Sequence, residues 1–163
     1  KPVFLPDYAN PAQLEVHLAV RICRLGRHIS ARFASRYYDA ATVMPHFIAP
    51  ALWEKTQKLG LPWDAALGFD KATPLGEFVE MAPSTVSQLD FSLRVDGEEQ
   101  MSGSTAQWLH HVDEVIAEVS QYFTLRRGDL LLRGAPTAPI SVTPDHKVET
   151  YLGDIRVLSF NVK

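Results

Sequence analysis

The sequence predicts a mainly β protein of the α+β class, folded as one domain over residues 1–163. Three observations predict this class. Apolar and polar residues alternate over 14–22, and a second alternating run over 89–95 leads into a turn dipeptide. The third observation is that strands and helices do not alternate regularly, which disfavours a parallel sheet with crossover helices.

The run over 14–22 is typical of a half-buried strand. Its apolar side chains occupy the even positions, from Leu14 to Ile22, while Glu15, His17 and Arg21 point to the opposite face. Gly26 follows this run and ends it.

Two helices and one further strand are expected next. Ser30 is suited to cap a short helix that reaches Tyr38, and residues 41–49 form a second strand-like run that Pro45 interrupts. Pro50 then suits the first turn of a helix over 50–59.

The second half of the chain is richer in strands. After an irregular stretch over 60–87, the run over 89–95 meets Asp96-Gly97, which is a strong hairpin signal. The remaining elements that we expect are an amphipathic helix over 106–122, a short strand over 128–133, and a hairpin over 147–162 that turns at Gly153-Asp154.

Composition excludes several classes of function. The 16 basic and 19 acidic residues give a net charge of −3, without the basic excess that a nucleic-acid-binding protein needs. No apolar run approaches the length of a membrane span. A single cysteine, Cys23, excludes an internal disulfide framework and favours a cytoplasmic location. We therefore expect neither nucleic acid nor membrane among the partners.

An ordered set of motifs resembles the fumarylacetoacetate hydrolase superfamily, especially its short bacterial acylpyruvate hydrolases and 2-hydroxyhepta-2,4-diene-1,7-dioate isomerases. The set covers nearly the whole chain. Its members are Leu14-Glu15-Val16-His17-Leu18, Gly60-Leu61-Pro62-Trp63, Gly68-Phe69-Asp70, Pro74-Leu75-Gly76, Val95-Asp96-Gly97-Glu98, Ser104-Thr105, residues 123–131, Gly134-Ala135-Pro136 and Tyr151-Leu152-Gly153-Asp154.

This resemblance implies a mixed β-sandwich roll with two or three short helices, usually assembled as a homodimer. It also implies a catalytic Mg²⁺ or Mn²⁺ ion, which acts in carbon–carbon hydrolysis, isomerisation or decarboxylation of β-diketo or 2-oxo acids. Short relatives begin with a further lid segment that carries a water-activating His and Glu. We expect the chain to lack this lid, so no catalytic residue is assigned.

The expected metal ligands are Glu15, His17 and His46. Relatives carry Glu-x-Glu on the early strand and an Asp after the next one, and the last two of these positions match His17 and His46 here. Imidazole is a poor ligand for Mg²⁺ and a good one for Zn²⁺ or Fe²⁺. The site therefore holds either Zn²⁺ or Fe²⁺ through the two histidines, the family ion weakly, or no metal.

Other matched positions have lost their charged or hydroxyl groups. Pro50 occupies the place of an Arg that grips the substrate carboxylate, and Leu67 that of a Lys that stabilises charge. A substrate-binding hydroxyl is replaced in Gly134-Ala135-Pro136, and Trp108 ends the segment at Ser104-Thr105. No substrate-binding residue is assigned.

Three functions stay open at this point; beside the two that follow, the chain could be an accessory subunit that pairs with an intact family member. In the first, the chain is a pseudoenzyme that keeps the family fold without the parent activity, with a small oxo acid as a candidate ligand. In the second, it is an active hydrolase or isomerase on a small oxo acid that uses the Glu15, His17 and His46 site.

Overall fold

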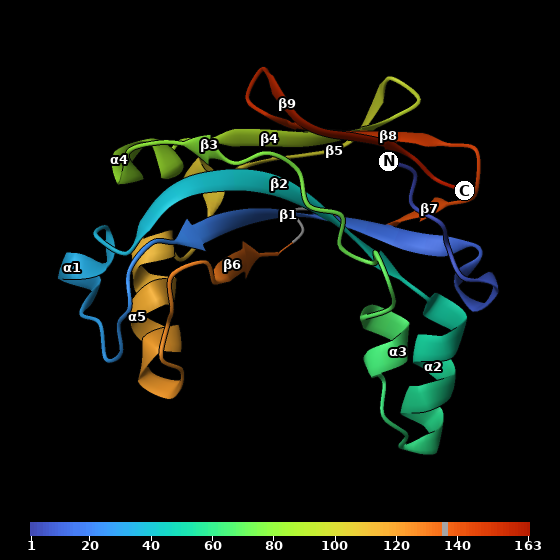
Figure 1. The fold of residues 1–163 in the computed structure, drawn as a ribbon, viewed down its shortest axis with the longest axis horizontal. Helices are drawn as coiled ribbons and strands as arrows, with labels where there is room; N and C mark the ends of the chain where they lie inside the picture. Colours follow the sequence, from blue (N-terminus) through green and yellow to red (C-terminus); the bar gives the residue numbers. More distant parts are fainter. Residues whose placement is uncertain (135–136) are drawn as a thin grey trace.

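The computed structural model describes residues 1–134 and 137–163. Two antiparallel sheets pack face to face (Figure 1). The first sheet has the strand order β3-β2-β1-β6, with β7 also paired to β1, and the second has the order β5-β4-β8-β9. The strands are β1 (Ala12–Ile22), β2 (Tyr38–Ile48), β3 (Val79–Glu80), β4 (Asp90–Val95), β5 (Glu98–Ser104), β6 (Leu130–Arg133), β7 (Ile140–Val142), β8 (Lys147–Leu152) and β9 (Ile155–Asn161).

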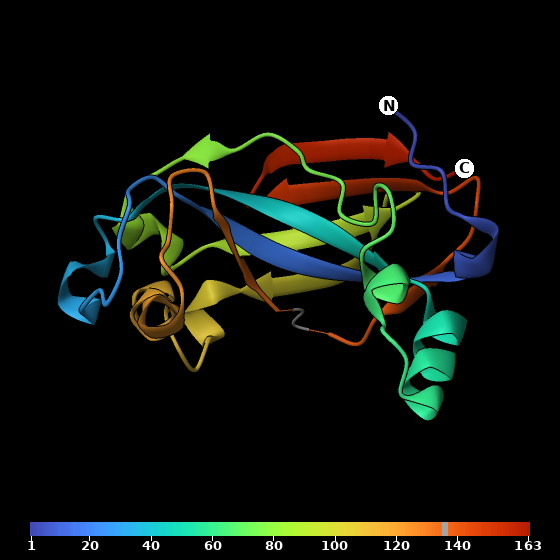
Figure 2. The same cartoon turned by 60° about the horizontal axis from the view of Figure 1, so that its bottom comes forward.

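Helices cover the outer face of the first sheet at its two ends. Figures 1 and 2 show α5 at one end of β1 and β2, and α2 with α3 at the other. The helices are α1 (Ala31–Ala34), α2 (Pro50–Leu59), α3 (Asp64–Leu67), α4 (Pro83–Val86) and α5 (Val112–Tyr122), with short 3-10 turns at Asp7–Ala9 and Thr105–Gln107. Within the described residues, no helix is long and apolar enough to cross a bilayer.

The hydrophobic core lies between the two sheets. The even-numbered residues of β1 from Leu14 to Ile22 are at most 1% exposed, as the alternation predicts, and they face Phe91 and Leu93 of the second sheet. The Thr150 hydroxyl on β8 donates to the Val43 carbonyl on β2 at 3.1 Å, so one buried polar group also joins the layers. The mainly β prediction and the sandwich are confirmed.

Pro45 does not interrupt its strand, contrary to the prediction. β2 runs from Tyr38 to Ile48, and Pro45 pairs with Val16 inside it. The N–H of Phe47, two residues on, points away from β1 because it donates to the Ala72 carbonyl at 2.7 Å. Since Pro45 shares that side, its missing donor removes no hydrogen bond from the β1–β2 ladder.

The helix predicted over 50–59 is confirmed as α2, whereas two other helices are shorter than predicted and further short helices are present. The helix expected over 30–38 is only Ala31–Ala34, because Tyr38 already begins β2, and the helix expected over 106–122 starts at Val112. The stretch over 60–87 is not wholly irregular, because it contains α3, β3 and α4. Five helices therefore stand among the described residues where the resemblance implied two or three.

The hairpin predictions are confirmed. Asp96 and Gly97 have φ values of 52° and 87°, the left-handed pair that a tight two-residue turn between β4 and β5 requires. The β8–β9 turn is at Gly153, whose φ is 56°.

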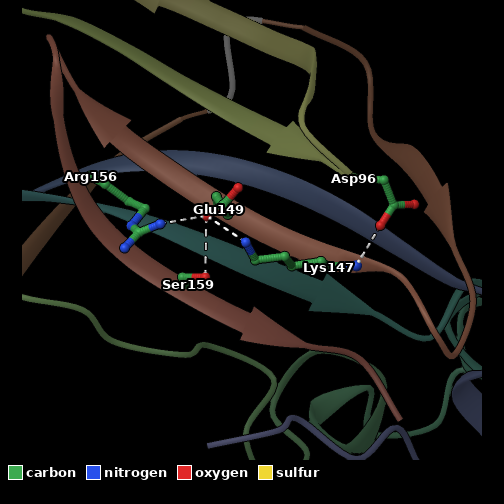
Figure 3. Close-up of polar contacts among 5 residues, drawn as sticks. All are labelled: Asp96, Lys147, Glu149, Arg156 and Ser159. Atoms are coloured by element: carbon green, nitrogen blue, oxygen red, sulfur yellow. Dashed lines mark hydrogen bonds and ion pairs between the residues drawn. The ribbon is translucent and has the colours of Figure 1, made fainter.

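An ionic cluster lies on the second sheet (Figure 3). The Glu149 side chain is 9% exposed, and its carboxylate accepts from Lys147 at 3.0 Å, Arg156 at 2.9 Å and Ser159 at 3.4 Å. The hydrogen bond from Lys147 and that from Arg156 lower the pKa of the Glu149 carboxyl. Next to it, Asp96 accepts the Lys147 backbone N–H at 2.8 Å and thereby fixes the start of β8.

We expect Leu18→Ala to lower the free energy of unfolding by about 3–5 kcal/mol, because it leaves a cavity in a core where Leu18 is fully buried. Leu109→Ala is the matched control, since Leu109 is 88% exposed, and its effect should stay within about 0.5 kcal/mol. Urea unfolding measures both. Equal losses for the two variants would contradict the assignment of the core.

We expect Glu149→Gln to cost about 1–2 kcal/mol at neutral pH, since the charged hydrogen bonds from Lys147 and Arg156 are weakened. The pKa of Glu149 is lower in the folded than in the unfolded state, so this contribution is present above the unfolded pKa and is lost as pH falls through the folded pKa. Unfolding of both proteins at pH 7 and pH 3 should show the difference shrinking on acidification. The exposed Glu118→Gln serves as control, and a difference independent of pH would refute the account.

Candidate metal site

The three expected ligands come from two paired strands. Glu15 and His17 are two residues apart on β1, so both point to the face that turns away from the second sheet. The antiparallel register places His46 of β2 directly opposite Glu15, on the same face. Strand pairing therefore brings together side chains that are about thirty residues apart in the sequence.

The donor atoms of this site lie close together. One ligand atom each from Glu15, His17 and His46 lies within 4.8 Å of the other two. The Nε2 atom of His17 is 3.3 Å from Oε2 of Glu15, and the side chains are 14% and 25% exposed. The imidazole rings of His17 and His46 have their centroids 5.9 Å apart. The predicted ligand set is thus assembled in the fold without rearrangement of the strands.

His46 also contacts a helix. Its Nε2 lies 2.8 Å from the Leu67 carbonyl oxygen at the end of α3. A carbonyl oxygen only accepts, so Nε2 carries the proton, and the ring nitrogen left to bind an ion is Nδ1. Leu67 is the residue matched to the family lysine; its backbone reaches the site, and its side chain brings no charge.

Burial governs the electrostatics at His17. Loss of water lowers the pKa of the imidazole, although the adjacent Glu15 carboxylate raises it and the neighbouring His46 lowers it further. His17 Nε2 is buried and finds no hydrogen-bond partner of acceptable geometry among the described residues. The nitrogen is 3.3 Å from the Glu15 carboxylate, and either a proton or a metal cation between the two atoms would pair them.

The residues present do not fit the all-oxygen shell that the family resemblance implies. Mg²⁺ takes carboxylates, carbonyls and waters, whereas this site offers one carboxylate and two imidazoles. The mismatch concerns the kind of donor, since the three side chains are close enough to share an ion.

The other matched positions have structural roles. Pro50 occupies the first turn of α2, and Thr105 is fully buried, where its hydroxyl accepts the Leu89 N–H at 2.8 Å. Trp53 and Trp63 pack edge to face with ring centroids 5.6 Å apart. Of the segment Gly134-Ala135-Pro136, residues 135 and 136 lie outside the described residues, so the expected loss of a hydroxyl there is not assessed.

His110 and Cys23 lie outside the candidate ligand set. The His110 ring lies 3.3 Å from the Glu114 carboxylate, four residues further along the chain, and the Glu114 carboxylate also accepts the His111 N–H. Cys23 is partly buried, and its thiol contacts the Arg36 carbonyl at 3.7 Å.

Two features of the structure have no signal in the sequence. The Leu67 carbonyl is a backbone group, and only docking of α3 against β2 brings it to His46. A cavity of about 550 Å³ opens between α4 and α5, where the buried Tyr38 hydroxyl donates to Asp113 at 2.9 Å. Burial and this hydrogen bond raise the pKa of Tyr38. No periodicity or motif connects Tyr38 with Asp113.

Comparison with known sequences identifies relatives along the whole chain. The mitochondrial oxaloacetate tautomerase of Mus musculus is 29% identical over 164 residues, which cover 99% of this chain and 74% of that protein. An uncharacterised protein of Pyrococcus abyssi is 29% identical over 161 residues, or 98% of this chain and 72% of that protein.

Solved structures share the fold. A fumarylacetoacetate hydrolase family protein of Yersinia pestis matches with a TM-score of 0.88 at 27% identity, over 99% of this chain and 78% of that one. The fumarylpyruvate hydrolase of Pseudomonas aeruginosa, solved with Mn²⁺ and pyruvate, also has a TM-score of 0.88, over 99% of this chain and 70% of that one; at 23% identity this match shows the fold alone.

The model of one family matches all of residues 1–163, and its description is fumarylacetoacetate hydrolase, C-terminal. This match agrees with the two-sheet fold, with the hairpin positions and with the relatives named above. The chain therefore belongs to the fumarylacetoacetate hydrolase family.

Proposed function

We propose that this chain binds one divalent metal ion through Glu15, His17 and His46, and takes a small oxo acid as ligand without the parent carbon–carbon cleavage. One observation carries the proposal: donor atoms of the three residues lie within 4.8 Å of one another. Homodimeric assembly and a cytoplasmic location belong to the same proposal and rest on the family resemblance and on the single cysteine.

Loss of the parent cleavage is supported by the residues at the positions that the resemblance matches to charged family residues. Breaking a carbon–carbon bond beside a carbonyl leaves negative charge that cationic or donor groups must stabilise, and removing one such donor costs about 3–4 kcal/mol of barrier. Pro50 at the N-terminus of α2 and Leu67 at the end of α3 supply neither a guanidinium nor an ammonium. The site keeps a carboxylate and two imidazoles, which suffice to hold a cation.

We expect the purified metal-free protein to take up about one equivalent of a divalent ion, measured by mass-spectrometric metal analysis and by calorimetry. Glu15→Gln removes the only charged donor of the three and should weaken binding at least about tenfold. Glu54→Gln on α2 is the control, because Glu54 is exposed and pairs only with the surface Lys58 among its described neighbours. Absence of uptake, or equal affinity in Glu15→Gln, would overturn the proposal.

A second candidate function is tautomerisation of a small oxo acid. The observation that favours it is 29% identity to the mouse oxaloacetate tautomerase across 99% of the chain. Tautomerisation moves a proton between carbon and oxygen and breaks no carbon–carbon bond. It therefore needs no activated water molecule, although the enolate that forms still has to be stabilised.

Oxaloacetate distinguishes the two functions. If the chain only binds, the metal-loaded protein should leave the rate of enol-to-keto conversion of oxaloacetate unchanged, as followed by ultraviolet absorbance. A faster conversion that disappears in Glu15→Gln and persists in Glu54→Gln would establish the tautomerase in place of the binding role.

A further inference from the structure

We propose that the Glu15, His17 and His46 site selects an imidazole-preferring ion, Zn²⁺ first, over Mg²⁺ and Mn²⁺, and that His46 binds this ion through Nδ1 while the Leu67 carbonyl holds its Nε2 proton. This inference rests on the proposed function and specifies which ion occupies the site. It departs from the ion that the family resemblance implies.

The spacing of two donors already suits a small tetrahedral ion. Two donors that are each about 2.1 Å from such an ion lie about 3.4 Å from each other. His17 Nε2 and Glu15 Oε2 are 3.3 Å apart, which matches that separation. A ligand atom of the third residue, His46, lies within 4.8 Å of those of the other two.

The contact to Leu67 has the form of an outer-shell hydrogen bond. Metal-bound histidines typically donate their second N–H to a carboxylate or to a backbone carbonyl, which fixes the tautomer and increases the basicity of the ligating nitrogen. His46 makes this contact at 2.8 Å before any ion is bound. The Asp that relatives carry at this position has no second N–H, so the contact is specific to the histidine.

The surroundings also disfavour a strongly hydrated ion. Met44 pairs with His17 across the two strands on the same face and is 5% exposed, and Ala19 on that face is fully buried. Mg²⁺ gives up its waters reluctantly and usually keeps several of them. A crowded, partly apolar wall beside two imidazoles favours an ion that binds nitrogen and accepts four ligands.

Most protein sites bind Zn²⁺ more tightly than Mn²⁺, so tighter Zn²⁺ binding alone would not support the inference. The test therefore compares the two ions in two proteins. The ratio of Mn²⁺ to Zn²⁺ dissociation constants is measured by competition calorimetry in the native chain and in the double variant His17→Glu/His46→Asp, which has three carboxylates. We expect this ratio to be at least tenfold larger in the native chain. Ratios that agree within twofold would overturn the inference.

The outcomes separate this inference from the function on which it rests. If neither ion binds the native chain, the proposed function fails. If both ions bind the native chain and the ratio of their dissociation constants equals that of the double variant, the metal site is supported and the proposed selectivity for Zn²⁺ is refuted. If the double variant does not fold, competition of Mg²⁺ and Mn²⁺ against Zn²⁺ in the native chain decides alone, and displacement of Zn²⁺ by a hundredfold excess of either ion would contradict the proposal.

Nitrogen NMR of the imidazoles tests the ligating atom. Zn²⁺ should shift the Nδ1 resonance of His46 and leave its Nε2 protonated, with slowed exchange of that proton. His146, whose ring pairs with Asp96 in the second sheet, provides the unaffected control. A metal-induced shift at Nε2 of His46, with loss of its proton, would refute the assignment.

Discussion

The register between β1 and β2 is the constraint on which the site depends. It places His46 opposite Glu15 and keeps His17 on the same face. Because side chains alternate along a strand, a slip of one residue in either strand would turn its ligands into the core and its apolar residues out to solvent. The buried side chains from Leu14 to Ile22 therefore hold the ligand face in place through their own burial.

Docking of α3 adds a backbone contact to the site that β1 and β2 form. α3 lies at one end of the first sheet, and its last carbonyl oxygen accepts a hydrogen bond from Nε2 of His46. That contact sets the tautomer of His46. At His17, burial lowers the pKa of the imidazole and the Glu15 carboxylate raises it. The fold thus brings three candidate donors together, and two of them are nitrogens where the family resemblance implies oxygens. The proposed change of ion rests on that exchange.

Sequence reasoning predicted most strands because their residues follow a strict period, whereas the candidate ligand set of Glu15, His17 and His46 came from the family resemblance. The alternation over 14–22 predicted the buried face of β1, and Asp96-Gly97 predicted a hairpin whose backbone requires left-handed residues. The same alternation put Glu15 and His17 on one face, and the structure brings His46 to them.

The sequence predicted less where elements are short or where backbone groups act. The helices α3 and α4 are one turn long, and β7 has three residues, so none of them shows a measurable period. Pro45 wrongly predicted a break in the strand. A proline interrupts a sheet only where its missing N–H would face a paired strand, and the sequence does not tell which side that is. The Leu67 carbonyl and the Tyr38–Asp113 pair arise from tertiary packing alone.

X-ray absorption at the zinc edge of the Zn²⁺-loaded chain tests the central claim most directly. The account predicts two imidazole nitrogens and a carboxylate oxygen at about 2.0–2.2 Å, with the signal of one imidazole lost when His46 is replaced by Ala. A shell made of oxygen alone, or one unchanged in that variant, would contradict it.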